Sequence, residues 1–380
     1  MARRLIAAIV VITALIACAP PADAGQRTSK AALQRALDGI VDARGGPPGV
    51  SVLIRHGGRD EFLRSGVADV RARRPPRRDD HMRIASMAKA FNGAVALALV
   101  SDGTLGLDDT IGARLPGMLP QAEAVTLRQA LRHDSGLADY IRQPAFIERL
   151  QDDPAAYITP RELLGYVRDR PLEFAPGTRY AYSDTDNIVA GLMTEAATGR
   201  SYEELLEREV YRPLGLRDTS LPRTVAMPRP YLHGYDVTPG RPPEDISRVI
   251  NPAGAWASGG IVSTPVDVGR FFRAYVRGRL FDDATRRSQF AFRQGSSSPP
   301  GPGSNAAGLG LFRYRTRCGT VYGHTGSFPG YRLFAAADEG GRRSVVFSVN
   351  AQIVPGQGSA AVSRRILRAQ ALAVCRALGR

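Results

Sequence analysis

Ser86 and Lys89 are the residues whose types and spacing suggest chemistry most clearly. They precede an apolar run over residues 91–100 that is typical of a buried helix ending near residues 101–103. A separation of three places both side chains on one helix face. A serine hydroxyl is a weak nucleophile until a base such as a neutral amine removes its proton. The pattern predicts a nucleophile in the first turn, where free N–H groups favour developing negative charge.

Lysine is almost absent from this chain. Of 51 basic residues only Lys30 and Lys89 are lysines, and the remainder are arginines. Arginine keeps its proton in proteins, whereas a buried lysine can lose its proton. We therefore interpret Lys89 as a residue retained for its titratable amine. Because S-x-x-K also occurs by chance, the interpretation requires catalytic partners elsewhere.

Two further stretches could supply those partners. Tyr182 and Asp184 lie two apart, so an extended segment would point both to one side. A tyrosine can act as a general base if nearby cations lower its pKa. His324, Thr325 and Gly326 end a predicted strand and offer a positive or donor side chain, a hydroxyl and room for a substrate. Taken alone, each stretch is more typical of ordinary packing than of a functional site.

The first 24 residues predict a targeting segment outside the fold. Two arginines precede an apolar core over residues 5–17, which is too short to span a bilayer comfortably, and Ala22-Asp23-Ala24 resembles a cleavage site. Lipid attachment at Cys18 is one alternative, and a retained anchor is another. We expect a domain outside the cytoplasm, secreted after cleavage behind Ala24 or anchored through Cys18.

Cys318 and Cys375 are the cysteines left in the mature chain. An even pair in an oxidising compartment predicts one disulfide, here between the strand region before Gly319 and the C-terminal helix. Metal ligation is the alternative, although none of the five histidines has ligand spacing with either cysteine. We expect no metal and no organic cofactor.

The chain is strongly basic, with a formal net charge of +15. The arginines are scattered, and no stacking or groove-reading motif accompanies them, so we expect no nucleic acid partner. The charge favours affinity for an anionic cell wall or membrane surface instead.

The order of patterns predicts an α+β fold. A helix over residues 30–41 and a hairpin over residues 50–67 precede mostly helical patterns, and strands over residues 310–350 precede a closing helix over residues 362–378. We expect one antiparallel sheet flanked by the N- and C-terminal helices, with a mostly helical inserted lobe. The expected division is residues 25–82 and 304–380 for the sheet lobe and 83–303 for the helical lobe, with the site in the cleft between them.

Three motifs in order resemble those of the serine D-alanyl-D-alanine carboxypeptidase and class C β-lactamase family of penicillin-recognising hydrolases. They are Ser86-Met87-Ala88-Lys89, Tyr182-Ser183-Asp184 and His324-Thr325-Gly326, and residues 131–137, 259–264 and 330–331 are similar too. The resemblance runs from about Lys30 to the C-terminus. It implies a β-lactamase/transpeptidase-like fold and an exported serine hydrolase that forms an acyl-enzyme. A D-alanyl-D-alanine carboxypeptidase acting on peptidoglycan stem peptides is the first expectation.

The resemblance also implies catalytic roles. Ser86 would be acylated, and Lys89 would exchange its proton and hold Tyr182 as phenolate. Tyr182 would act as base in acylation and then protonate the leaving group. The backbone N–H groups of Ser86 and Ser327 would form the oxyanion hole, which is usually the largest contribution in acyl transfer.

Substrate binding is implied for the third motif. His324 and Thr325, followed by Gly326, would help to bind a substrate carboxylate, and Arg313 and Arg315 are candidates to grip it. Similar actinomycete-type carboxypeptidases carry Cys-Gly just before this strand. Cys318-Gly319 matches that feature, which supports the disulfide to Cys375.

Two positions depart from the family pattern. Asp184 stands where the family commonly has asparagine, and an ionised carboxylate can only accept hydrogen bonds, so it would repel a substrate carbonyl. His324 stands where class C β-lactamases have lysine, which argues against efficient β-lactam hydrolysis. A β-lactamase or broad esterase is therefore the alternative enzyme, and an inactive cell-wall or penicillin-binding protein is the alternative of another class. We expect a monomer with a small substrate.

Overall fold

The computed structural model describes residues 28–293, 298–353 and 360–380. The predicted targeting segment 1–24, with Cys18, lies outside the described residues. No helix in those three ranges is long and apolar enough to cross a membrane.

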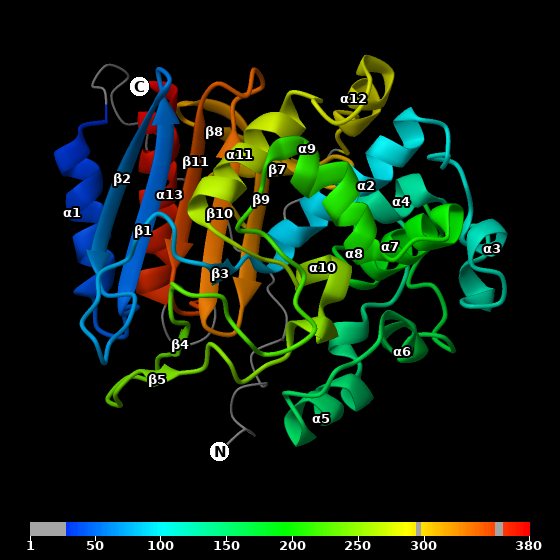
Figure 1. Cartoon of the computed structure of the whole chain (residues 1–380), viewed down its shortest axis with the longest axis horizontal. Coiled ribbons are helices and arrows are strands. Elements are labelled where there is room, and N and C mark those ends of the chain that lie inside the picture. The colour runs from blue at the N-terminus through cyan, green and yellow to red at the C-terminus, as the bar shows by residue number, and fades with distance from the viewer. Residues whose placement is uncertain (1–27, 294–297, 354–359) are drawn as a thin grey trace.

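A seven-stranded antiparallel sheet joins the two ends of the chain (Figure 1). Its order is β2-β1-β11-β10-β9-β8-β7, and β1 pairs with β11 from Val50 opposite Val349 to Arg55 opposite Ser344. The predicted α+β fold with an antiparallel sheet is confirmed. The strands are β1 (Gly49–His56), β2 (Arg59–Gly66), β7 (Ser304–Ala307), β8 (Phe312–Thr316), β9 (Gly319–Phe328), β10 (Tyr331–Ala337) and β11 (Ser344–Val349).

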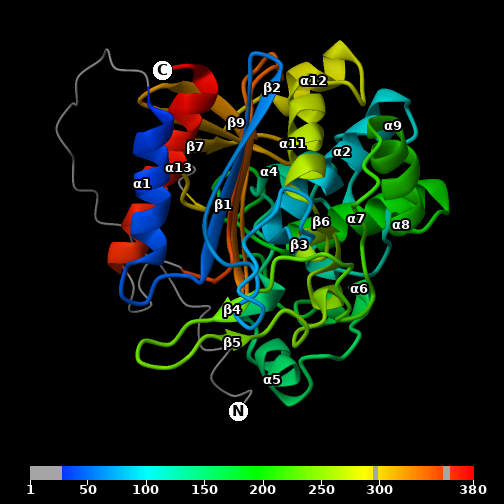
Figure 2. The ribbon, with the colours of Figure 1, turned by 60° about the vertical axis from the view of Figure 1, so that its left-hand side comes forward.

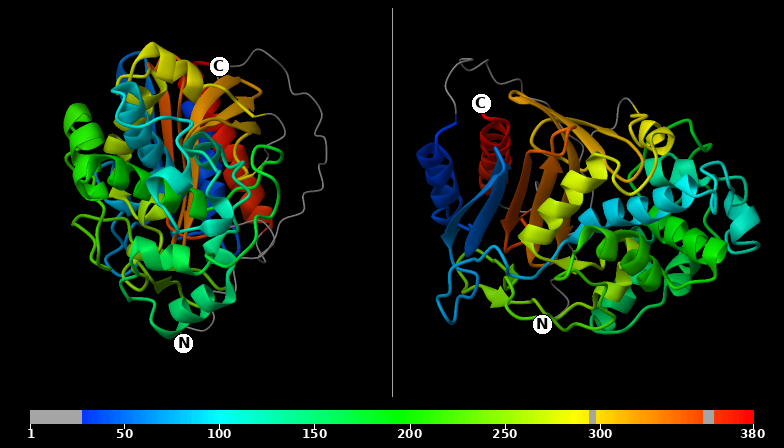
Figure 3. Two further views of the ribbon diagram at one scale, coloured as in Figure 1. Left: turned by 90° about the vertical axis from the view of Figure 1, so that its right-hand side faces the viewer. Right: turned by 45° about the horizontal axis from the view of Figure 1, so that its top comes forward.

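The terminal helices α1 (Lys30–Val41) and α13 (Ala360–Leu378) lie side by side on one face of this sheet (Figures 2 and 3). Ser29 caps α1 by accepting a hydrogen bond from the Ala32 N–H at 3.0 Å. Leu33 and Leu37 follow helical spacing and are fully buried. They pack in a cluster with side chains of α13 and of the sheet, which explains why both helices are amphipathic.

The segments between β2 and β7 are mostly helical and cover the other side of the sheet. The helix α11 (Pro265–Val276) packs on β10 and β11. Two short two-stranded sheets link loops: β3 (Met82–Arg83) pairs with β6 (Val262–Ser263), and β4 (Tyr235–Asp236) pairs with β5 (Glu244–Asp245). The other helices are α2 (Ala88–Ser101), α3 (Ile111–Arg114), α4 (Leu127–Arg132), α5 (Pro144–Asp152), α6 (Pro160–Gly165), α7 (Thr185–Thr198), α8 (Tyr202–Leu205), α9 (Arg212–Leu214), α10 (Trp256–Gly259) and α12 (Asp283–Gln289).

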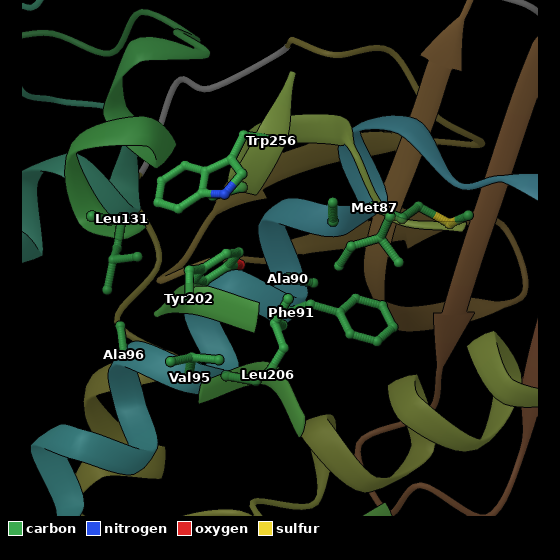
Figure 4. Packing of buried hydrophobic residues seen from close by; sticks show 14 of the residues in the cluster. Met87, Ala90, Phe91, Val95, Ala96, Leu131, Tyr202, Leu206 and Trp256 are labelled. Atoms are coloured by element: carbon green, nitrogen blue, oxygen red, sulfur yellow. The ribbon is translucent and has the colours of Figure 1, made fainter. Parts of the chain in front are cut away.

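The helix α2 is the centre of the helical part, and all its residues from Ala88 to Leu99 are buried. A helix that is apolar on every side needs neighbours all round. Figure 4 shows its side chains among residues of other elements, including Tyr202, Leu206 and Trp256. Phe91 stacks on Phe271 of α11 with ring centroids 3.6 Å apart. This packing fixes the helix that carries Lys89.

Three details differ from the sequence-based expectation. Ser86 lies in a 3₁₀ turn, η2 (Ala85–Met87), just before α2, and a π-helical turn, η5 (Leu206–Tyr211), continues α8. The strand β9 continues through the His-Thr-Gly motif to Phe328, because residues 322–328 pair with β10. In the sequence, the small polar residues of this motif are typical of the end of a strand. Only the pairing with β10 shows that β9 continues. The two-lobe division stays a prediction.

Cys318 and Cys375 form the predicted disulfide. It joins the turn between β8 and β9 to α13, and Cys375 is fully buried. The bond therefore fixes the strand that carries the third motif to the C-terminal helix.

Replacing both cysteines (Cys318→Ser with Cys375→Ala) should lower the free energy of unfolding by about 4 kcal/mol, because the bond restricts a loop of 57 residues in the unfolded chain. Urea unfolding of the oxidised protein, the reduced protein and the double variant measures the effect. The reduced wild type should resemble the double variant. Equal stability of all three would show that the bond contributes nothing.

Candidate active site

The turn that carries Ser86 is fixed from both sides. The Ile84 N–H donates to the Ile261 carbonyl at 3.0 Å, which ties the residue after β3 to the residue before β6. Ala85 has φ of 51°, a left-handed conformation that costs energy for a residue with a Cβ. Ser86 follows at once and is half-buried.

Gly326 allows β9 to approach this turn. A Cβ at Gly326 would lie 2.5 Å from the Ile84 carbonyl oxygen and 3.2 Å from the Ala85 Cβ. The sequence suggested that this glycine makes room for a substrate, but its open side meets the Ser86 turn instead. Because β8 pairs only with residues 319–323 of β9, residues 324–328 pair with β10 alone among the described strands.

Lys89 connects the first two motifs. Its side chain is 1% exposed, and Nζ contacts Ser86 Oγ at 3.3 Å, Asp184 Oδ1 at 2.6 Å and the Ser258 carbonyl at 2.9 Å. The carboxylate and the carbonyl can only accept hydrogen bonds. A neutral Lys89 amine would therefore give its two N–H groups to them and direct its lone pair at Ser86 Oγ. This orientation is the one that a base for the serine hydroxyl requires.

Ser258 was missed by the sequence analysis. It contributes a backbone carbonyl from α10, and a carbonyl leaves no signature in the residue type. The nearby stretch 259–264, which resembles the family, was the only available indication.

Tyr182 lies against Lys89, as the next distance shows. Asp184, which the sequence placed with Tyr182 in an extended segment, lies in a different conformation. Asp184 has helical torsion angles at the N-cap of α7, and Lys89 Nζ lies 4.9 Å from the centre of the Tyr182 ring. Burial, reinforced by the charge of Asp184, raises the pKa of Tyr182 well above its usual range, while the Ser86 hydroxyl acts in the opposite direction. Burial thus favours the phenol form of Tyr182, and the phenolate role implied by the family resemblance stays a prediction.

The Tyr182 hydroxyl oxygen is buried and makes no hydrogen bond of strict geometry in the described part of the chain, although the Ser86 hydroxyl is close enough to lower its pKa. Its ring is supported by His133, whose ring centroid is 4.5 Å away. His133 Nδ1 contacts Asp186 Oδ2 at 2.9 Å, and Ser135 Oγ donates to Asp186 Oδ1. Burial lowers the pKa of His133 to about 3. This neutral group positions the ring, and the stretch 131–137 was its only signal in the sequence.

His324 is neutral rather than positive. It is 1% exposed, and burial lowers its pKa to about 3. Its Nδ1 lies 2.5 Å from the Thr325 carbonyl, which can only accept, so Nδ1 carries the proton and Nε2 has a lone pair. Burial thus disfavours a positive charge on His324, and its expected role in binding a substrate carboxylate stays a prediction. Thr325 beside it is 9% exposed.

The other binding residues are placed in different surroundings. Phe312 of β8 lies near Tyr182, with ring centroids 6.4 Å apart, whereas the Arg313 guanidinium stacks on Phe292 at 4.8 Å. Neighbouring residues of a strand point to opposite faces, so Arg313 and the exposed Arg315 face away from Tyr182. The structure does not bring these two arginines to the site.

Ser327 lies near the free end of β9. It is exposed, and its hydroxyl accepts a hydrogen bond from Gln352 Nε2 at 3.1 Å. The oxyanion role of its N–H group stays a prediction.

The three described ranges contain no group of three or more His, Cys, Asp or Glu side chains that could hold a metal.

Lys89→Arg should reduce turnover of a p-nitrophenyl ester about 100- to 10,000-fold, because a guanidinium keeps its proton and cannot accept that of Ser86. Lys30→Arg is the matched control, since Lys30 is exposed on α1. The control should retain full activity, and circular dichroism should show both variants folded. A folded Lys89→Arg protein with wild-type turnover would contradict the role of the amine.

Gly326→Ala should reduce turnover about 100-fold, because the added Cβ pushes β9 away from the Ser86 turn and small displacements in an active site are costly. Gly165→Ala on α6 is the control, because its Cβ would meet nothing within 4 Å. Steady-state kinetics of both variants measures the effect. If Gly326→Ala behaves like Gly165→Ala, close approach of β9 is not needed.

Comparison with known proteins agrees with this geometry. The sequence matches the beta-lactamase family over residues 33–370. A D-aminopeptidase of Cereibacter sphaeroides is 30% identical over 338 residues, which cover 84% of this chain and 60% of the relative. The D-alanyl-D-alanine-carboxypeptidase/endopeptidase AmpH of Escherichia coli is 27% identical, covering 65% of this chain and 61% of the relative. The chain thus spans about 60% of the length of these curated relatives.

A solved structure matches over nearly its whole length. The D-stereospecific amidohydrolase from Streptomyces superposes with a TM-score of 0.78 and 30% identity, covering 90% of this chain and 98% of that one. The fold, the match over residues 33–370 and the grouping of Ser86, Lys89 and Tyr182 lead to one conclusion. The chain belongs to the beta-lactamase family of serine hydrolases.

Proposed function

We propose that this protein is an exported hydrolase that cleaves amide bonds next to D-amino acid residues through an acyl-enzyme on Ser86. The observation that carries the proposal is the contact of Lys89 Nζ with Ser86 Oγ, with two acceptors on the other side of the amine. Export is supported by the targeting pattern of residues 1–24 and by the disulfide, which is typical of oxidising compartments.

The proposed reaction has two halves. In acylation, Ser86 Oγ attacks the substrate carbonyl carbon while its proton passes to the unprotonated amine of Lys89, which becomes an ammonium. The tetrahedral oxyanion is stabilised by the N–H groups of Ser86 and Ser327. Tyr182 then donates its phenolic proton to the leaving nitrogen and recovers a proton from Lys89, so the C–N bond breaks with all protons accounted for. In deacylation, water replaces the leaving amine and the same groups act in reverse.

The preference for D-residues is supported by the names of the relatives. A D-aminopeptidase, a D-stereospecific amidohydrolase and a D-alanyl-D-alanine-carboxypeptidase/endopeptidase all act beside D-configured residues. The natural substrate we propose is a peptide with D-residues, such as the stem peptides of an anionic cell wall. A monomer stays our expectation.

Carboxypeptidase action on D-alanyl-D-alanine is the second candidate, and the similarity to AmpH favours it. This action requires a group that binds the terminal carboxylate. The neutral His324 and the turned-away Arg313 argue against it. Hydrolysis of β-lactams or simple esters would use the same acyl-enzyme.

A panel of substrates tests the proposal. The p-nitroanilide of D-alanine should be turned over at least about tenfold faster than that of L-alanine, a preference of about 1.4 kcal/mol in the transition state. Ser86→Ala should abolish both activities. Acetyl-lysyl-D-alanyl-D-alanine and a chromogenic cephalosporin complete the panel, with products identified by mass spectrometry. Faster turnover of either of these, or of the L-anilide, would reject the proposal.

A further inference from the structure

Asp184 has a carboxylate oxygen that the catalytic arrangement does not use. Oδ1 accepts the 2.6 Å bond from Lys89, and the backbone N–H of Asp184 donates to Asp139 Oδ1 at 3.1 Å. Oδ2 has no hydrogen-bond partner among the residues that the structure describes. The side chain is 12% exposed, whereas its partner Lys89 is 1% exposed. Asp184 therefore presents an acceptor to solvent next to the nucleophile.

The position of this oxygen relative to Ser86 suits a substrate group. Both Ser86 Oγ and Asp184 Oδ1 contact Lys89 Nζ, so these two oxygens are at most about 5.9 Å apart. A substrate whose carbonyl carbon meets Oγ carries its α-amino nitrogen two bonds from that carbon and three bonds from Oγ. An α-amino group that extends from the bound carbonyl carbon toward Asp184 would approach its carboxylate.

The groups around Asp184 are mainly acceptors. Asp139 Oδ1 accepts from the Asp184 N–H, and burial lowers the pKa of His324 to about 3. His324 also offers a lone pair on Nε2 rather than a donor. An acyl carbonyl would meet acceptors in this region, whereas an ammonium would find a carboxylate.

We propose that Asp184 binds the free α-ammonium group of the substrate and makes the enzyme selective for unblocked D-aminoacyl amides over N-acylated ones. The inference rests on the proposed function, because it specifies which D-residue amides enter the site. The asparagine common in the family could donate to an acyl carbonyl, and Asp184 cannot. One substitution would thereby separate amino-terminal from carboxy-terminal cleavage.

The test compares D-alanine p-nitroanilide with its N-acetyl derivative in the wild type, in Asp184→Asn and in Asp139→Asn. The wild type should prefer the free amine, and Asp184→Asn should reduce the ratio of the two kcat/KM values about 10- to 100-fold, the usual effect of a hydrogen bond to a charged group. A purely structural role would lower both activities and leave the ratio unchanged. Asp139→Asn removes a neighbouring carboxyl and should keep the wild-type ratio.

Further substrates separate the possible outcomes. An unchanged ratio in Asp184→Asn, or an equal loss in Asp139→Asn, would overturn the inference while anilide cleavage upholds the proposed function. If no anilide is cleaved, the methyl esters of D-alanine and N-acetyl-D-alanine decide. A free-amine preference that Asp184→Asn removes would then support the inference although the proposed function fails.

If Asp184→Asn does not fold, (R)-lactic acid p-nitroanilide replaces it as the test in the wild type. Turnover at least about tenfold below that of the D-alanine anilide supports ammonium binding, and equal turnover overturns it.

Discussion

The hydrogen bond from Lys89 Nζ to the Asp184 carboxylate is the interaction on which the site depends. A buried pair stabilises a protein only when hydrogen bonds compensate the loss of water. Here Nζ meets the carboxylate at 2.6 Å, the Ser258 carbonyl at 2.9 Å and Ser86 Oγ at 3.3 Å. Burial raises the pKa of Tyr182 and lowers those of His133 and His324 to about 3, so it favours the uncharged forms of the three groups beside this contact. The orientation of the amine follows from this arrangement.

The fold brings these groups together from distant parts of the chain. Lys89 lies on α2, Asp184 begins α7, Ser258 lies on α10 and His324 lies on β9. The helix α2 is buried on every side, so its neighbours hold it firmly. The Ser86 turn is fixed by the Ile84 hydrogen bond and by the close approach of β9 at Gly326. Lys89 and Ser86 thus rest on a helix and on the turn before it, and this support keeps their geometry constant through a reaction.

Much of this could be predicted from the sequence. The spacing of Ser86 and Lys89, the rarity of lysine, and the two-residue and 3.6-residue patterns predicted the nucleophile, the amine and the α+β fold. The disulfide followed from counting cysteines, and its partners are confirmed. These features depend on residue type and short-range spacing, which a sequence states directly.

The remainder depends on contacts between distant segments. The carbonyl of Ser258 has no residue-type signature, and the neutral state of His324 results from burial and from the bond to the Thr325 carbonyl. The direction of Arg313 depends on the register of β8.

The most direct test of the central claim is peptide mapping by mass spectrometry after exposure to penicillin or a fluorophosphonate. The account predicts one adduct, on the peptide that contains Ser86. An adduct on a different residue, or a folded protein that reacts with neither reagent, would contradict it.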